Sequence, residues 1–246
     1  IYFAMITLAL AQMVYFFYAW GRVTAGNPDR QVSFAVPTGN FGDVFAGYMA
    51  KRMGLPVDRL IIATNRNDIL SRFVHTGVYA AGEVFPTLSP AMDIQIASNF
   101  ERYLYFLLGE DPTAVRGLLD DMASTGRLAV GALHHAQVRA DFDALASSDQ
   151  ETLDQIRATY AQCGYILDPH TATGVRAAQG HADAICLATA HPAKFGEAVT
   201  LAIGSEAPPP PSLQGLLEKE TRCARLEASE TAIRAYIRDT LGLAGQ

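Results

Sequence analysis

The alternation of apolar and polar positions divides the chain into short buried strands and amphipathic helices. The clearest unit spans residues 32–54, where a mostly apolar run, 32–37, is followed by a segment with helical spacing, 44–54, that closes at Gly54. The first run predicts a buried strand and the second an amphipathic helix. Between them lies a polar turn that contains Gly39 and Gly42.

The same strand–turn–helix order is repeated directly downstream. Residues 60–64 form a second apolar run, and a helical pattern at 69–75 follows a polar turn. Two such units in a row predict neighbouring parallel strands with right-handed crossovers. A further compact apolar run, 184–188, ends just before Thr189. We therefore predict an α/β fold with an open, mainly parallel sheet and helices on both faces.

The other segments predict loops and helices. Residues 77–90 carry Gly, Pro and Thr without a period, which is typical of a loop. Ser98, with Glu101 three residues later, fits a capping box at a helix start. Asp168 before Pro169 fits another helix start.

Composition changes along the chain and suggests its domain organisation. From residue 111 to 164 the sequence turns polar and helical with no strand-like run, and a proline run precedes a last amphipathic helix, 225–243. We divide the chain into an α/β region (1–110), an accessory helical segment (111–164), a return to the α/β region (165–206) and a C-terminal helical tail (207–246).

The first twenty residues carry no charge, and by length they could span a membrane. They lack the basic start of a signal peptide. Polar Thr7 and Gln12 and the closely spaced tyrosines and phenylalanines are typical of a helix buried inside a large α/β protein. We therefore predict no membrane span.

Charge and cysteine usage exclude several classes of protein. The 246 residues are 50% apolar and 18% charged, with a formal net charge of −6, which argues against a nucleic-acid partner. Cys163, Cys186 and Cys223 lack CxxC spacing and indicate reduced thiols in the cytoplasm. His134 and His135 are adjacent, so they cannot share one helical face as a metal pair, and we predict no metal site.

The polar turn after the first strand has the features of an anion site. A turn that opens a helix leaves free backbone N–H groups and the positive end of the helix dipole aimed at one point, and glycines let a bulky anion approach. The geometry suits a phosphate. An ordinary strand-to-helix connection is the alternative, because short glycine patterns are weak evidence.

The wording of this turn, Pro-Thr-Gly-Asn-Phe-Gly-Asp, resembles the phosphate loop of threonine synthases, which are pyridoxal-phosphate (PLP) enzymes of fold type II, the tryptophan-synthase-β-like fold. Met5–Leu8 departs from the family pattern, as do Ala97 and Ala188, which replace serines. Five further stretches resemble the family in the same order: 11–20, 63–68, 98–102, 168–174 and 189–195.

The resemblance implies the cofactor, pyridoxal 5'-phosphate, and its contacts. The family's Schiff-base lysine lies upstream of this chain's first helix, so we expect no catalytic residue here, and we reject Lys194 for that role. Structural roles are the alternatives for Asn99 and Arg102. The cofactor phosphate would be held by Thr38, Gly39, Asn40, Phe41, Gly42 and Asp43, the ring nitrogen would meet Thr189, and substrate contacts would come from Asn65, Asn99, Arg102 and His170.

The implied activity is that of a carbon–oxygen lyase acting on phosphates, which converts O-phospho-L-homoserine and water to L-threonine and phosphate. We expect the chain to be a C-terminal fragment that is inactive alone, whose partners are the small-molecule substrate and a missing N-terminal segment. The protein would be a cytoplasmic monomer or dimer. Two alternatives stay open: a threonine-synthase-like phospho-lyase, and a non-catalytic fragment that binds PLP or phosphate.

Overall fold

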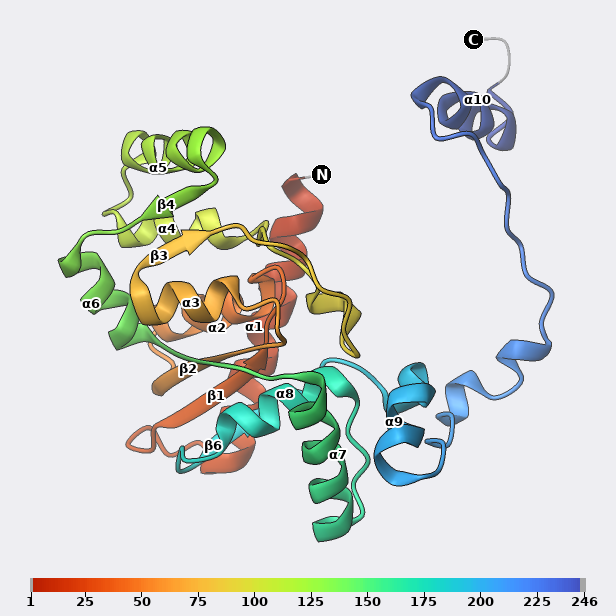
Figure 1. The fold of residues 1–246 in the computed structure, drawn as a ribbon, viewed down its shortest axis with the longest axis horizontal. Helices are drawn as coiled ribbons and strands as arrows, with labels where there is room; N and C mark the ends of the chain where they lie inside the picture. Colours follow the sequence, from red (N-terminus) through yellow and green to blue (C-terminus); the bar gives the residue numbers. More distant parts are fainter. Residues whose placement is uncertain (1, 244–246) are drawn as a thin grey trace. The chain divides into compact units, whose positions relative to one another are not determined.

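A computed structural model describes residues 2–243, and side chains from residue 11 onward except that of residue 217 (Figure 1). The chain divides into two compact units, Ile1–Pro208 and Pro209–Gln246. The side chains at the family departure Met5–Leu8 lie outside the described part.

A four-stranded parallel sheet forms the centre of the first unit. Its strand order is β5-β2-β1-β6, with Val36 opposite Ile62 and Ala35 opposite Cys186. The predicted parallel α/β sheet is confirmed. The strands are β1 (Val32–Pro37), β2 (Val57–Thr64), β5 (Phe142–Ala146) and β6 (Ala184–Cys186).

Two strand assignments made from sequence are wrong. Strands β4 (Arg127–Ala129) and β5 both lie inside 111–164, where no strand was expected. The five residues of β5 were missed because Asp143 keeps them from forming a continuous apolar run. The charge is tolerated there because β5 is an edge strand. The expected loop 77–90 contains β3 (Val78–Ala80), which pairs antiparallel with β4.

Helices cover both faces of the parallel sheet (Figure 1). The 3₁₀ turns are Pro90–Met92, Pro192–Phe195, Pro211–Leu213 and Leu216–Glu218. The α-helices are α1 (Tyr2–Thr24), α2 (Gly42–Arg52), α3 (Ile69–Thr76), α4 (Phe100–Leu107), α5 (Pro112–Thr125), α6 (Ala132–Asp141), α7 (Asp149–Cys163), α8 (Pro169–Ala178), α9 (Gly196–Ile203) and α10 (Glu230–Thr240).

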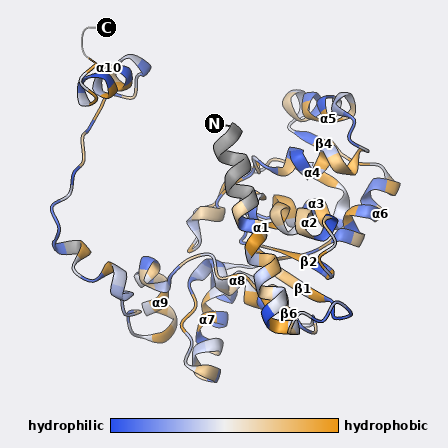
Figure 2. Ribbon diagram, turned by 180° about the vertical axis from the view of Figure 1, so that it is seen from behind, coloured by the Kyte–Doolittle hydropathy of each residue, from blue (hydrophilic) through white to orange (hydrophobic). Residues whose placement is uncertain are grey.

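Side chains of β1 and β2 alternate between two cores. Phe34, Val36 and Leu60 point into the larger core with α2, α3 and α4, whereas Ala35 and Ile61 face α8 in a smaller one. Small residues on the α8 side let that helix lie close to the sheet. Hydrophobic colour accordingly concentrates on β1 and β2 in Figure 2.

Helix α1 is buried on one side only. Phe16 is fully buried against Phe34 of β1, but Tyr15 and Tyr18 are 62% and 65% exposed. The prediction of a helix buried in the protein is therefore correct for one face. No helix in the described part of the chain is long and apolar enough to cross a membrane.

The two predicted helix caps have different outcomes. Asp168 caps α8 by accepting hydrogen bonds from the N–H groups of His170 and Thr171, as expected. The capping box at Ser98 is wrong, because α4 begins one residue later with Asn99 as its N-cap and without a side-chain cap. Asn99 is engaged elsewhere, since its backbone N–H and its amide both donate to the Asn40 carbonyl.

The second unit consists of two 3₁₀ turns and α10, which confirms the predicted last helix with shorter bounds. Its apolar residues Ile233, Tyr236 and Ile237 are exposed.

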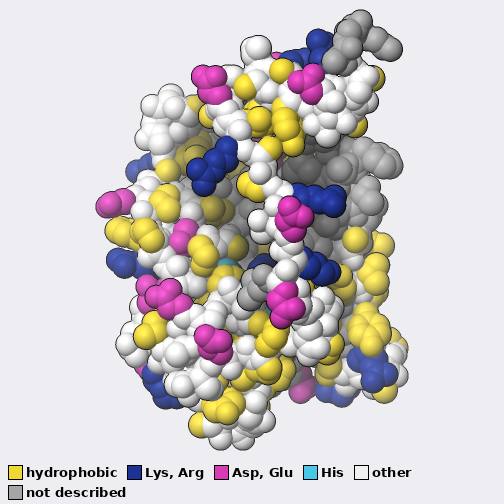
Figure 3. Space-filling view, turned by 90° about the vertical axis from the view of Figure 1, so that its right-hand side faces the viewer, with side chains coloured by type: hydrophobic (Ala, Val, Ile, Leu, Met, Phe, Trp, Pro, Cys, Tyr) yellow, Lys and Arg dark blue, Asp and Glu magenta, His cyan; other side chains and the backbone are white. Residues whose placement is uncertain are grey.

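Positive and negative side chains are interspersed on the face drawn in Figure 3, without a large patch of either sign.

Candidate functional site

The turn between β1 and α2 presents unpaired backbone donors. Phe41 adopts a left-handed conformation with φ of 69°, and the N–H of Gly42 donates to the Asn40 side chain at 3.0 Å. Within the described residues, no acceptor is present for the N–H groups of Gly39, Asn40 and Asp43. These donors and the start of α2 form an anion-binding arrangement with no Lys or Arg in the turn.

Close packing explains both glycines of the turn. A Cβ atom at Gly39 would lie 2.7 Å from the carbonyl oxygen of Ala91, and one at Gly42 would lie 3.1 Å from the Asn40 side-chain oxygen. The first distance is too short for any side chain, and the close neighbour is rigid backbone. The turn therefore has glycine at 39 because the segment 89–92 crosses directly over it.

A cavity of about 480 Å³ lies beside the turn. It brings together the two parts of the chain that the sequence singled out, since Asp43 and Thr189 both line it. Thr189 follows the carboxyl end of β6, the edge of a parallel sheet at which ligands gather. The remaining lining residues are Gln12, Tyr15, Tyr18, Ala19, Leu187 and Ala188.

Asp43 carries an unusual carboxyl group. One of its oxygens is buried and has no hydrogen-bond partner among the described residues. Burial raises the pKa of Asp43 to about 6, because the charged form loses its hydration. Below about pH 6 this carboxyl group holds a proton, and in that form it can donate a hydrogen bond to an anion as well as accept one.

The wall of the cavity contributed by α1 was not predicted. Gln12, Tyr15 and Tyr18 belong to the uncharged N-terminal stretch, whose aromatic residues were assigned to the core. The signal was visible as two tyrosines at i and i+3, which lie on one helix face. Sequence alone does not say whether such a face meets protein or a ligand cavity.

Asn65 and His170 are buried and fully engaged with protein. The Asn65 amide donates to Thr87, Ser89 and Asp93, and these bonds tie the crossing segment to the end of β2. His170 contacts the Asp168 carboxylate at 3.1 Å, and its other ring nitrogen accepts from the N–H of Ala91 at 3.3 Å. Both residues therefore position the segment that lies over Gly39.

The other two predicted substrate contacts lie apart from each other. Asn99 braces the turn through the Asn40 carbonyl at 3.1 Å. Arg102 lines a different groove, of about 680 Å³, between α2, α4 and α5. None of the four residues lines the cavity that holds Thr189, so their substrate role stays a prediction.

Comparison with known proteins identifies close similarity along nearly the whole chain. The family model "Threonine synthase, C-terminal" matches residues 171–237. Threonine synthase from Pseudomonas aeruginosa is 47% identical over 234 residues, which are 93% of this chain and 50% of that protein. Threonine synthase-like 2 from Homo sapiens is 34% identical over 94% of this chain.

Solved structures agree with the sequence matches. PLP-bound threonine synthase from Brucella melitensis superposes with a TM-score of 0.89 at 46% identity, covering 94% of this chain and 50% of that one. Yeast threonine synthase gives 0.86 at 36% identity. The chain spans about half the length of the curated relatives it matches.

Proposed function

In sequence and in fold this chain belongs with the threonine synthases, and we propose that it carries the cofactor-phosphate side of such an enzyme. The reaction would convert O-phospho-L-homoserine and water to L-threonine and phosphate, with PLP as the cofactor. The observation that carries the proposal is the single cavity lined by both Asp43 of the turn and Thr189 after β6.

The turn fits the phosphate group of the cofactor. Its free N–H groups at Gly39, Asn40 and Asp43 supply donors without a cationic side chain, and the absence of a side chain at Gly39 keeps the turn seated under Ala91. Phe41 anchors the turn from below, because its ring is buried against Phe100 and Phe142. Thr38 is held by the Ala63 carbonyl and in turn fixes the end of β1.

Thr189 would set the electronic character of the cofactor. When bound, PLP acts as an electron sink for carbanion chemistry. A hydroxyl at the ring nitrogen, unlike an aspartate, does not hold that nitrogen protonated, so the ring stays a weaker sink. Tyr15 and Tyr18 would form the wall of the cavity against solvent, since both rings line it.

A chimaeric enzyme tests the proposal. This chain is fused in frame to the half of the Pseudomonas aeruginosa relative that it does not match, and threonine and phosphate release from O-phosphohomoserine are measured. We expect activity, and we expect Gly39→Ala to lower it by at least tenfold, because a Cβ would meet the Ala91 oxygen at 2.7 Å.

The matched control is Gly117→Ala, a position with no neighbour within 4 Å of the added carbon. It should leave turnover unchanged. A folded chimaera in which Gly39→Ala and the parent bind PLP and turn over equally would show that the turn is not the phosphate site.

A threonine-synthase-like phospho-lyase is the second candidate. Such an enzyme would eliminate phosphate without adding water at the β carbon. Product analysis on the same chimaera separates the two activities, because a phospho-lyase releases phosphate without forming an equal amount of threonine.

A further inference from the structure

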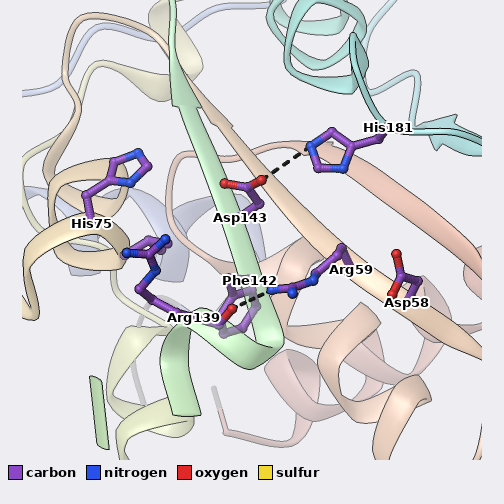
Figure 4. Close-up of a pocket in the computed structure, with 8 residues that line it drawn as sticks. Asp58, Arg59, His75, Arg139, Phe142, Asp143 and His181 are labelled. Atoms are coloured by element: carbon purple, nitrogen blue, oxygen red, sulfur yellow. Dashed lines mark hydrogen bonds and ion pairs between the residues drawn. The ribbon is translucent and has the colours of Figure 1, made fainter. Parts of the chain in front are cut away.

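A polar pocket of about 320 Å³ lies near the amino ends of the parallel strands, opposite to the end at which the candidate cofactor cavity lies (Figure 4). Asp58 and Arg59 are near the start of β2, and Asp143 is near the start of β5. The candidate cofactor cavity lies beyond the carboxyl ends of the strands. Asp58 and Thr64 are six positions apart on β2, so the two ends of this strand are about 20 Å apart at ~3.3 Å per residue.

Two arginines give this pocket unused hydrogen-bond donors. Figure 4 shows Arg59 and Arg139 reaching it from opposite sides of β5. Arg59 donates one N–H to the Arg139 carbonyl. Within the described residues the Arg139 guanidinium has no partner, so most of the ten N–H groups of the two side chains are free.

The acidic groups of the pocket already have partners. Asp143 pairs with the His181 ring at 3.3 Å and accepts from the N–H of Ala144. Asp58 accepts from the Ser33 hydroxyl at 3.4 Å. The His75 ring contacts the Ala144 carbonyl at 3.1 Å, and its Nε2 must carry the hydrogen because a carbonyl only accepts.

This inventory favours an anion over a cation. Most of the free groups are guanidinium donors, whereas Asp143 is held by His181 and the Ala144 N–H, and Asp58 accepts one hydrogen bond from Ser33. No group of three or more His, Cys, Asp or Glu side chains in the described part of the chain is arranged to hold a metal ion. Guanidinium forks match the paired oxygens of carboxylates and phosphates.

We propose that the pocket between the amino ends of β2 and β5 binds a small oxyanion, a phosphate or a carboxylate, between the guanidinium groups of Arg59 and Arg139. Val74 and Phe142, both buried, are the apolar residues that line the pocket. The proposal is independent of the proposed function.

The test is a titration of the 246-residue chain with inorganic phosphate and, separately, with succinate, followed by the ring resonances of His75 and His181 in NMR spectra. These two histidines line the pocket, whereas His170 and His191 do not and serve as internal references. We expect saturable shifts confined to His75 and His181, and the two titrations tell phosphate from carboxylate ligands.

Arg139→Gln should weaken binding at least tenfold, because it removes one of the two guanidinium groups. The side chain is exposed, so we expect the variant to fold like the parent. Arg59→Lys keeps the charge and loses the fork, so it should weaken binding as well. Arg116→Gln, on α5, is the matched control and should bind like the parent. Equal binding by Arg139→Gln, or no saturable shift with either anion up to about 20 mM, well above ordinary millimolar affinities, overturns the proposal.

Discussion

At the scale of the residue, the Asp43 carboxyl group links the candidate site to the stability of the protein. Its pKa lies at about 6 in the folded chain, against a value of 3.8 for the free side chain, because burial disfavours the charge. Between these two values the unfolded chain loses the proton first. Folding stability therefore falls as the pH rises from about 4 to about 6, and the loss persists above pH 6.

We predict that Asp43→Asn stabilises the chain above pH 6 by about 3 kcal/mol, since an amide avoids the cost of burying a charge, which is about 1.4 kcal/mol for each pKa unit. Below pH 4 the variant and the parent should be equally stable. Urea unfolding at pH 4 and pH 8 measures both differences. If the variant and the parent differ in stability by the same amount at both pH values, the pKa of Asp43 is not raised by folding.

Asn99 shows how a predicted site residue can act through the backbone. Its amide was assigned a substrate role with a structural alternative, and its observed contact is the Asn40 carbonyl at 3.1 Å. That bond orients the peptide in the middle of the turn between β1 and α2. The side chain thus shapes the candidate site without lining its cavity.

At the scale of the element, the packing of α1 on α2 depends on one missing side chain. A Cβ atom at Gly47 would lie 2.5 Å from the Phe16 ring and 2.9 Å from Leu60. Because α1 supplies Tyr15 and Tyr18 to the cavity, the contact of Phe16 with Gly47 also fixes one wall of the candidate site.

We predict that Gly47→Ala destabilises the chain by about 1–3 kcal/mol, the usual cost of overfilling a packed core. Gly21→Ala, in α1 with no neighbour within 4 Å of the added carbon, is the matched control and should stabilise by about 0.5–1 kcal/mol, as expected when alanine replaces glycine inside a helix. Thermal unfolding of both variants measures the contrast. A stable Gly47→Ala would mean that α1 is not seated against α2 through Phe16.

The elements that could be predicted from sequence are those whose pattern is uniform and locally determined. β1 is a mostly apolar run, the predicted run 60–64 is the second half of β2, and α2 and α3 have clear helical spacing, so all four were found. β5 was missed because it is short and Asp143 divides its apolar residues, and only the sheet order shows that it is an edge strand. The Ser98 capping box failed because a tertiary contact of Asn99 shifts the helix start.

The part of the candidate site that is encoded by one contiguous stretch of sequence could be predicted, and the part that depends on tertiary contacts could not. The turn between β1 and α2 is one contiguous motif, so its donors and glycines could be identified directly. The meeting of Asp43 with Thr189 depends on β6 pairing with β1, across about 150 residues of sequence, and the sequence supplied it only through resemblance. Tyr15 and Tyr18 were assigned to the core because an aromatic helix face has the same pattern whether it meets protein or a cavity.

At the scale of the whole molecule, the distribution of lysines bears on what this chain can do alone. It has three, Lys51, Lys194 and Lys219. A lysine that bonds PLP must be held beside the ring to react at a useful rate. No lysine lines the cavity of Asp43 and Thr189 among the described residues.

The three lysines have surroundings of their own, distinct from the lining of this cavity. Lys51 is nine residues beyond Gly42 on α2, about 13 Å along the axis at ~1.5 Å per residue. Its amine lies 3.3 Å from the Asp58 carbonyl and 3.8 Å from the Asp141 carboxylate, near the amino end of β2. Lys194 lines a separate pocket with Thr87 and Phe195, and Lys219 belongs to the second unit.

We predict that the 246-residue chain, mixed with PLP and reduced with borohydride, acquires no stoichiometric pyridoxyl label on any of these lysines. Peptide mapping by mass spectrometry measures the label at each site. In the chimaera with the Pseudomonas aeruginosa half, one stoichiometric label should form on a lysine of that half, because the cavity of this chain would then face a complete partner. Stoichiometric label on Lys194 of the chain alone would instead make it self-sufficient for covalent PLP binding, and would move the reactive amine to the pocket beside Phe195.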